Sequence, residues 1–288
     1  MNNKKINTVG IIVTTFRENT EEILNNVYNI LDKHDITYTL IEYDISYYKS
    51  ISEVSVMFCS VDMIISIGGD GTLLSALKIA IKCNTPVLPI YNGTLGFISE
   101  IPPDEAYTIL EEYLSSDTNT SYKIEPRVLL HVSTIRNNVT KNYLAVNDMV
   151  ISKNDGRVIH LDIKISDRVV SYLVADGVVV ATPTGSTAYA LSAGGPILAP
   201  QIDAMSFVAI APHSLTFRPL VIPKEDNIEL SLAKKNLKAM LTIDGYDICE
   251  VDSDTIIKTQ ISNKYCYIFQ SSNRLFYDIL RYKLNWGR

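Results

Sequence analysis

Three glycines, an aspartate and a threonine in one short motif are the residues of this sequence best placed to do chemistry. The motif Gly68-Gly-Asp-Gly-Thr72 directly follows the apolar run Met63–Ile67. Glycines leave backbone N–H groups uncovered and permit positive φ, and a helix that begins at such a turn favours anions. A carboxylate beside bound phosphates indicates either a base for an incoming hydroxyl or a holder of Mg²⁺. The alternative is a plain strand-to-helix turn, in which Asp70 or Thr72 caps the helix.

A second glycine-containing segment, Asn92-Gly-Thr-Leu-Gly-Phe97, follows the next apolar run. It predicts a second loop at the same edge of the sheet, and the alternative is a connector with Phe97 in the core. The motif Gly68–Thr72 has neither the Gly-Lys-Ser/Thr ending of a Walker A loop nor the Gly-x-Gly-x-x-Gly of a Rossmann turn. If this is a nucleotide enzyme, it therefore uses another scheme.

The elements that must position these loops alternate along the first part of the chain. Hydrophobic periodicity predicts strands at 8–15, 36–41, 63–67 and 85–90, and helices at 19–31, 72–82 and 102–114. Residues 44–60 are ambiguous, with a possible helix at 52–59. This alternation predicts an α/β domain with a parallel sheet. Asp70 then lies just past the carboxyl end of a strand, where open α/β sheets bind their ligands.

The pattern changes after the polar, helix-poor stretch 115–121. Short β-rich runs divided by turn residues predict a β-rich, sandwich-like second domain. We expect domain bounds at 1–120 and 121–270, and a terminal helix within 271–288 that packs on the first domain. The expected strands lie at 127–135, 143–151, 157–165, 169–182, 207–210, 220–222, 228–232, 238–243 and 255–262.

Composition excludes several classes of function. The net charge of −6 implies no general basic face, so nucleic acid is not an expected partner. The four cysteines and four histidines are dispersed and form no zinc pattern. No apolar run approaches the roughly 18 residues of a membrane span, and the first apolar run is too short for a signal-peptide core. We therefore expect a soluble, cytoplasmic protein with no membrane partner.

Five motifs occur along the chain in one order: Gly68-Gly-Asp-Gly-Thr72, Asn92-Gly-Thr-Leu-Gly-Phe97, Asn147-Asp148, Asp176-Gly177 with Thr182-Pro-Thr-Gly-Ser-Thr-Ala-Tyr189, and Pro212-His-Ser-Leu-Thr-Phe-Arg-Pro219. Together they resemble the NAD kinase family, the ATP or polyphosphate:NAD 2′-phosphotransferases. The glycine tetrad alone is weakly specific, because diacylglycerol and sphingosine kinases and phosphofructokinases carry similar tetrads. The fourth motif is highly specific, and the resemblance extends over most of the chain.

The resemblance implies a role for each matching residue. Asp70 would be the general base for the adenosine-ribose 2′-OH of NAD, and Mg²⁺, whose protein ligands the sequence does not name, would bridge the phosphates of ATP or polyphosphate. The donor phosphates would bind at Gly68, Gly69 and Thr72. The residues implied for NAD binding are Asp70, Gly71, Phe97, Asn147, Asp148, His160, Asp176, Thr187, Ala188, Tyr189 and Ser192.

Within that set, the resemblance divides the substrate. Asn147 and Asp148 would hold the nicotinamide-side ribose, Asp176 would bond the nicotinamide or its ribose, and residues 187–192 would line the adenosine half. The chain departs from the family at two positions: Asp148 stands where members usually carry Glu, and Tyr246 stands where they often carry Gln.

The family also implies a substrate cleft between the two domains and a homodimer or homotetramer, often with one subunit's β domain completing another's site. Two alternatives remain open. A lipid kinase that shares the tetrad would need an apolar acceptor pocket and a basic membrane-facing patch, and the sequence has no basic amphipathic stretch. A non-catalytic dinucleotide sensor would bind NAD without transferring phosphate.

Overall fold

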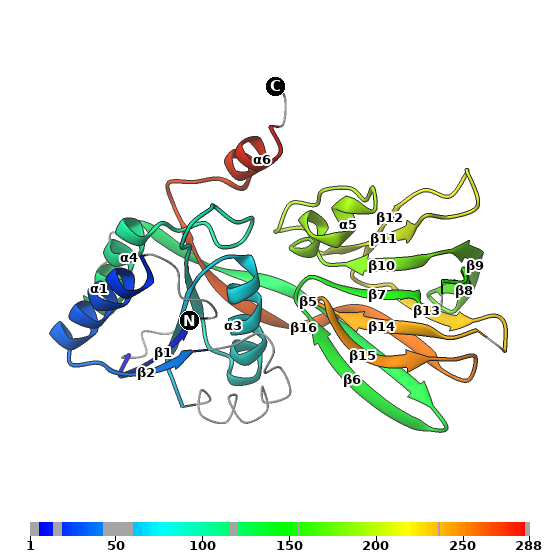
Figure 1. The fold of residues 1–288 in the computed structure, drawn as a ribbon, viewed down its shortest axis with the longest axis horizontal. Coiled ribbons are helices and arrows are strands. Elements are labelled where there is room, and N and C mark those ends of the chain that lie inside the picture. Colours follow the sequence, from blue (N-terminus) through cyan, green and yellow to red (C-terminus); the bar gives the residue numbers. More distant parts are fainter. Residues whose placement is uncertain are drawn as a thin grey trace. The chain divides into compact units, whose positions relative to one another are not determined.

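The computed structural model of the chain describes residues 6–13, 19–42, 60–115, 120–154, 156–235 and 237–285 (Figure 1). The chain forms two compact units. The first comprises Met1–Pro126 and Cys266–Arg288, and the second comprises Arg127–Tyr265. The predicted classes, α/β for the N-terminal part and β-rich for the C-terminal part, are confirmed. The possible helix at 52–59 lies outside the described residues.

A parallel sheet forms the centre of the first unit. Its strand order is β2-β1-β3-β4-β16, and each strand pairs in parallel with its neighbour. Every residue of β3 is buried, as expected for a strand whose two faces are both covered. The strands are β1 (Thr8–Val13), β2 (Thr37–Glu42), β3 (Met63–Ile67), β4 (Val87–Ile90) and the last part of β16 (Ile256–Ser271).

Helices cover both faces of this sheet (Figure 1). Apolar residues of α1 (Thr20–Lys33) and α4 (Pro103–Ser115) form one core with alternate residues of the central strands. Helix α3 (Asp70–Cys83) packs on β3 and β4 from the other face. The chain ends in α6 (Phe276–Leu284). None of the helices in the described ranges is long and apolar enough to cross a bilayer.

Two sheets form the second unit, with the order β6-β5-β16-β13-β8-β9 in one and β12-β11-β10-β7-β14-β15 in the other. Apolar residues of both sheets form a single core, as in a β-sandwich. Besides the first part of β16, the strands that lie wholly or mainly in this unit are β5 (Tyr122–Arg136), β6 (Val139–Ala145), β7 (Asp148–Lys153), β8 (Ile159–Ile165), β9 (Arg168–Ala175), β10 (Gly177–Ala181), β11 (Ala204–Ile210), β12 (Leu220–Pro223), β13 (Asn227–Leu232), β14 (Ala239–Ile243) and β15 (Tyr246–Val251).

Two of the predicted strands are each broken in two. The chain leaves the first sheet and enters the second between β6 and β7, at residues 146–147, and again between β9 and β10, at Asp176. A strand that changes layers must interrupt its pairing, and hydrophobic patterning does not reveal such a corner. The prediction also missed β15, an edge strand of the second sheet whose charged residues weaken the apolar signal.

Candidate active site

The glycine motif joins β3 to α3 in the first unit. Gly68 has φ of 153°, and a Cβ at this position would lie 2.3 Å from Oγ1 of Thr72, so only glycine fits. By contrast, a Cβ on Gly69 or Gly71 would meet no atom within 4 Å. The motif is therefore tightly packed at its first residue and open beside the two glycines that follow. The order of the sheet reverses between β1 and β3, and Asp70 follows the carboxyl end of β3.

The Asp70 carboxylate does not cap its own helix. The N-cap is Gly69, and no side chain hydrogen-bonds there. Instead, Oδ2 of Asp70 accepts a hydrogen bond from the N–H of Phe97 at 2.8 Å, and Oδ1 accepts from Ile98 at 3.1 Å and Ser99 at 2.9 Å. The interpretation of the motif as a self-capped turn is thus wrong, because the carboxylate binds the second glycine segment.

That second segment is held from several sides. The hydroxyl of Ser99 donates to the carbonyl of Gly68 at 3.0 Å, and a Cβ on Gly96 would lie 2.0 Å from Oδ1 of Asp70. Nζ of Lys283, on α6, donates to the carbonyl of Leu95 at 2.9 Å and stands 5.5 Å from the centre of the Phe97 ring. The two glycine segments therefore meet at one edge of the sheet, as predicted. Sequence reasoning missed Ser99 and Lys283, because neither belongs to a motif.

In the second unit, Asn147 lies at the corner between β6 and β7, and Asp148 is the first residue of β7. Asn147 is half-buried and Asp148 is buried. The carboxylate of Asp244 accepts hydrogen bonds from the main chain of this corner. Sequence reasoning assigned Asp244 no role, although an Asp-Gly pair between two strands is a recognised turn signal.

The segment that follows β10 packs beside this corner. It contains η2 (Gly185–Thr187) and α5 (Tyr189–Ser192), and Ala190 packs against the outer face of the second sheet. A Cβ on Gly185 would lie 2.0 Å from the carbonyl oxygen of Asn147, so glycine permits the close approach. Thr187 and Ala188 are half-buried, whereas Tyr189 and Ser192 are exposed. The structure thus brings together two of the predicted NAD-binding groups of this unit.

Asp176 lies away from Asn147, Asp148 and the segment 187–192. Asp176 precedes β10, whereas Asp148 pairs with Ala181 at the other end of that strand. At about 3.3 Å per residue, the two positions are about 16 Å apart along the sheet. The carboxylate of Asp176 forms a salt bridge with Lys153, with N and O atoms 2.8 Å apart.

His160 lies at the Asp176 end of the unit, because it pairs with Val174 in β9. Its Nδ1 lies 2.5 Å from the Tyr172 hydroxyl, and its Nε2 lies 3.1 Å from Nζ of Lys234. Burial lowers the pKa of His160, and the nearby Lys234 and His213 lower it further. Because the Lys234 ammonium can only donate, Nε2 of His160 is the acceptor of that contact.

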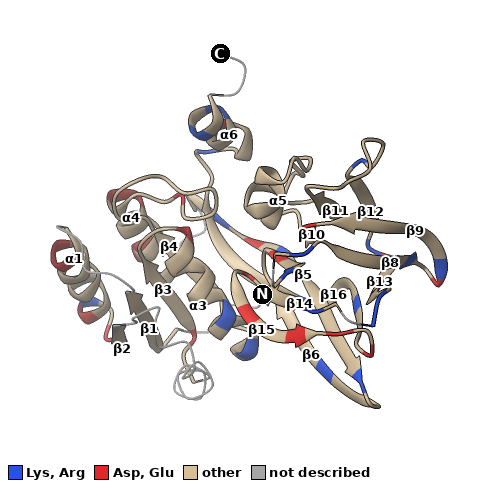
Figure 2. Cartoon of the chain, turned by 45° about the vertical axis from the view of Figure 1, so that its right-hand side comes forward, with Lys and Arg blue, Asp and Glu red and all other residues tan. Residues whose placement is uncertain are grey.

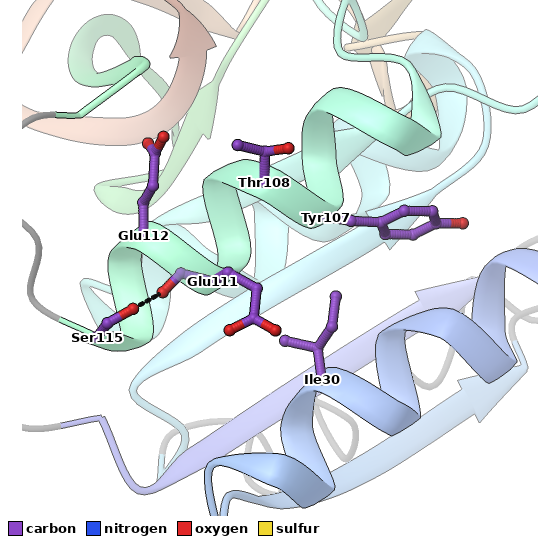
Figure 3. Close-up of a pocket in the computed structure, with 6 residues that line it drawn as sticks. All are labelled: Ile30, Tyr107, Thr108, Glu111, Glu112 and Ser115. Atoms are coloured by element: carbon purple, nitrogen blue, oxygen red, sulfur yellow. Dashed lines mark hydrogen bonds between the residues drawn. The ribbon is translucent and has the colours of Figure 1, made fainter.

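No cluster of three or more His, Cys, Asp or Glu side chains suited to a metal ion occurs among the described residues. A cavity of about 450 Å³ lies between α1 and α4 (Figure 3). None of the predicted site residues lines it; its walls are Ile30, Tyr107, Thr108, Glu111, Glu112 and Ser115.

Comparison with known families matches both parts of the chain. The model of the ATP-NAD kinase N-terminal domain matches residues 9–118, and that of the ATP-NAD kinase C-terminal domain matches residues 146–271. The chain is 34% identical over 281 residues to an NAD kinase of Caldanaerobacter subterraneus subsp. tengcongensis, which covers 96% of this chain and 98% of the relative. It is 33% identical to an NAD kinase of Sulfurimonas denitrificans, over 100% of both chains.

Solved structures share the fold. A yeast NADH kinase in complex with NADH superposes with a TM-score of 0.85 and 24% identity, over 98% of this chain and 88% of that one. An Archaeoglobus fulgidus NAD kinase in complex with ATP superposes with a TM-score of 0.74 and 24% identity, over 95% of this chain and 97% of that one.

Proposed function

The chain belongs to the NAD kinase family and is an NAD kinase, and from that premise we propose how its residues carry the reaction. The γ-phosphoryl group of ATP passes to the 2′-hydroxyl of the adenosine ribose of NAD. One O–P bond forms at that oxygen, the bond between the β- and γ-phosphates breaks, and the hydroxyl proton goes to Asp70. An alcohol is too weakly acidic to ionise at neutral pH, so a positioned carboxylate accepts its proton as the new bond forms.

The hydrogen bonding of Asp70 is the observation that best supports this role. A carboxylate has about four acceptor sites. The N–H groups of Phe97, Ile98 and Ser99 occupy three of them, which fixes the orientation of the carboxylate. One acceptor site remains for the substrate hydroxyl. Positioning of this kind supplies much of the catalysis in phosphoryl transfer.

We assign the donor phosphates to the backbone of the glycine motif and the first turn of α3, with Gly68, Gly69, Gly71 and Thr72. The open space beside Gly69 and Gly71 supports this assignment, because an anion must approach the amides closely. A magnesium ion that arrives with ATP would be held mainly by phosphate oxygens and water, because Mg²⁺ commonly binds these rather than a protein cage. When bound, the ion neutralises charge on the phosphates.

NAD is proposed to bind the second unit through two neighbouring groups. Thr187, Ala188, Tyr189 and Ser192 line the adenosine half, and the exposed ring of Tyr189 is available to stack on the base. Asn147 and Asp148 bind ribose hydroxyls. Asp148 has one methylene less than the glutamate common in the family, so it must lie closer to its ligand.

Asp176 does not reach, within one second unit, the ribose that Asn147 and Asp148 would bind. Asp148 and Asp176 lie about 16 Å apart along the sheet, which is farther than two short side chains can reach to one ribose. We therefore propose that Asp176 and His160 act on NAD bound to another copy of the chain, in a homodimer or homotetramer. Such sharing makes self-association a requirement of the site.

An apolar surface of the second unit supports self-association. Leu215 is 90% exposed and Val169 is 77% exposed. Strands β10, β11 and β12 carry no charged residue and are tan in Figure 2. A cavity of about 380 Å³ opens on this surface. Exposed apolar patches of this kind mark interaction sites. Val170, Tyr172 and Leu220 line this cavity, and all three are exposed.

The activity is tested by NADP formation from NAD with Mg-ATP, and then with polyphosphate as donor. The wild type is expected to form NADP with ATP. Binding of NAD without NADP formation from either donor would favour the dinucleotide sensor. Phosphorylation of a lipid alcohol in place of NAD would favour the lipid kinase.

Site sharing is tested by mixing two inactive variants, Asn147→Ala and Asp176→Ala. If each site takes Asn147 from one copy and Asp176 from another, hybrid oligomers contain intact sites and recover activity. No recovery, in hybrids isolated through a different affinity tag on each variant, would place both residues in one chain's site or outside the site. Leu215→Glu should lower the oligomeric mass in light scattering. The matched control is Leu275→Glu, which adds the same charge at an exposed leucine of the first unit.

A further inference from the structure

Asp244 is a buried carboxylate in a place where most aspartates are solvated. It occupies the two-residue turn between β14 and β15, with φ of 49° for Asp244 and 80° for Gly245. Positive φ at both residues is typical of the type I′ hairpin turn, which favours Asp-Gly. Yet Asp244 is only 5% exposed. A buried carboxylate needs hydrogen-bond donors, and its donors come from the corner between β6 and β7.

The carboxylate of Asp244 accepts from three consecutive backbone N–H groups. Oδ2 accepts from Val146 at 3.1 Å, and Oδ1 accepts from Asn147 at 2.7 Å and Asp148 at 3.2 Å. The N–H of Asp244 donates in return to the carbonyl of Asp148 at 2.9 Å. Hydrogen bonds to an ionised acceptor are the stronger kind, so the corner is firmly held on its donor side.

Thr182 holds the acceptor side of the same corner. Its hydroxyl donates to the carbonyl of Val146 at 2.6 Å, and its N–H donates to the carbonyl of Asn147 at 2.8 Å. The same hydroxyl accepts from the N–H of Gly185 at 3.0 Å. The corner is therefore hydrogen-bonded to Asp244 on one side and to Thr182 on the other. Thr182 also connects it to the segment that carries the proposed adenosine-binding residues.

We infer that Asp244 is a positioning residue for NAD binding: it fixes the Asn147–Asp148 corner, through which it also sets the register of the segment that begins at Thr182. The inference rests on the proposed function for the role of Asn147. Asp244 would act through the backbone of residues 146–148, which its carboxylate contacts directly. An uncharged side chain at position 244 would weaken these hydrogen bonds, because three N–H donors converge on the one carboxylate.

The test compares Asp244→Asn with wild type. The amide keeps the shape but directs an NH₂ group toward N–H donors. We expect the Kd for NAD by calorimetry and the KM for NAD to rise about ten-fold or more, with the KM for ATP within about two-fold of wild type. The matched control is Asp247→Asn, an exposed aspartate of the same hairpin, which should leave all three values unchanged.

The unfolding temperature of Asp244→Asn is measured together with its affinity for NAD. If Asp244 served stability alone, the substitution would lower the unfolding temperature and leave the affinity unchanged. Unchanged NAD affinity in folded Asp244→Asn would overturn the inference. If that variant does not fold, Thr182→Val takes its place: it should weaken NAD binding, and Thr182→Ser, which keeps the hydroxyl, should restore it. Failure of serine to restore binding would also overturn the inference. Calorimetric binding does not require turnover, so an inactive wild type that binds NAD would refute the proposed function and leave this test intact.

Discussion

The carboxylate of Asp70 accepts a hydrogen bond from the backbone N–H of Phe97 at 2.8 Å, across a sequence separation of 27 residues. The proposed base is thus also the anchor of the second glycine segment. Any substitution of Asp70 changes both proton acceptance and loop position, and the two effects must be separated by a second variant.

Asp70→Asn is expected to lower kcat for NADP formation by about 10²–10⁴-fold, because the amide cannot accept the hydroxyl proton. Steady-state kinetics with calorimetric NAD binding measures the loss. Ser99→Ala serves as the control, since it removes only the hydroxyl that donates to Gly68 and keeps the carboxylate. If Ser99→Ala loses as much rate as Asp70→Asn, loop position rather than the base explains the effect. If Asp70→Asn is fully active, Asp70 is not the base.

Gly96→Ala should disturb Asp70 without altering its chemistry. The added Cβ would lie 2.0 Å from Oδ1 of Asp70, a distance that forces the carboxylate or the loop to move. We expect at least a ten-fold loss of kcat and a lower unfolding temperature. Activity and thermal midpoint equal to wild type would show that the loop absorbs the methyl group freely.

Gly71→Ala offers a contrasting case in the same motif. A Cβ there meets nothing within 4 Å, and alanine is favoured over glycine in a helix by roughly 0.5–1 kcal/mol. The unfolding temperature should therefore stay level or rise. If ATP phosphates approach this backbone, the methyl group obstructs them and the KM for ATP rises. An unchanged KM for ATP would remove Gly71 from the proposed donor site.

Lys283→Met should weaken the hold of α6 on the Leu95–Phe97 segment, because it removes both the donor to Leu95 and the charge over the ring. The side chain is exposed, and exposed cation–π contacts contribute about 0.5–1 kcal/mol, so we expect a loss of roughly two- to five-fold in kcat/KM for NAD. Arg281→Met, an exposed position on the same helix, is the control. Equal losses in both variants would indicate a general effect of charge.

The stability of the first unit should depend on pH through Glu111. Hydrogen bonds from His34 and Lys33 lower the pKa of Glu111, and this residue joins α4 to α1 beside the cavity of Figure 3. A lowered folded pKa contributes stability above the unfolded value of 4.5, and the contribution is lost as pH falls through the folded pKa.

Urea unfolding of wild type and Glu111→Gln at pH 7 and near pH 3 measures that contribution. The wild type should be more stable at pH 7 by less than about 1 kcal/mol, since the pair is partly exposed, and the difference should shrink at the lower pH. A difference that grows on acidification would contradict the assignment.

Local patterning was enough to predict most elements of this chain. The apolar run Met63–Ile67 matches β3 residue for residue, and the helix expected at 19–31 is α1 with small shifts at its ends. Buried strands and amphipathic helices carry their periods in the sequence, so neighbouring residues suffice to identify them. The glycine motif likewise predicts a turn, because few other residues permit the positive φ found at Gly68.

Contacts between distant residues decided the rest. Asp70 binds amides that follow it by 27 to 29 residues, and Asp244 binds the Asn147 amide across 97 residues. Asp148 and Asp176, which were both predicted to bind NAD, lie at opposite ends of β10, because the chain changes sheets at residues 146–147 and again at Asp176. Most elements, the motifs and their order can be predicted from neighbouring residues. Which carboxylate holds which loop depends on tertiary contacts, because hydrogen bonds between distant segments depend on how the layers pack and leave no local period.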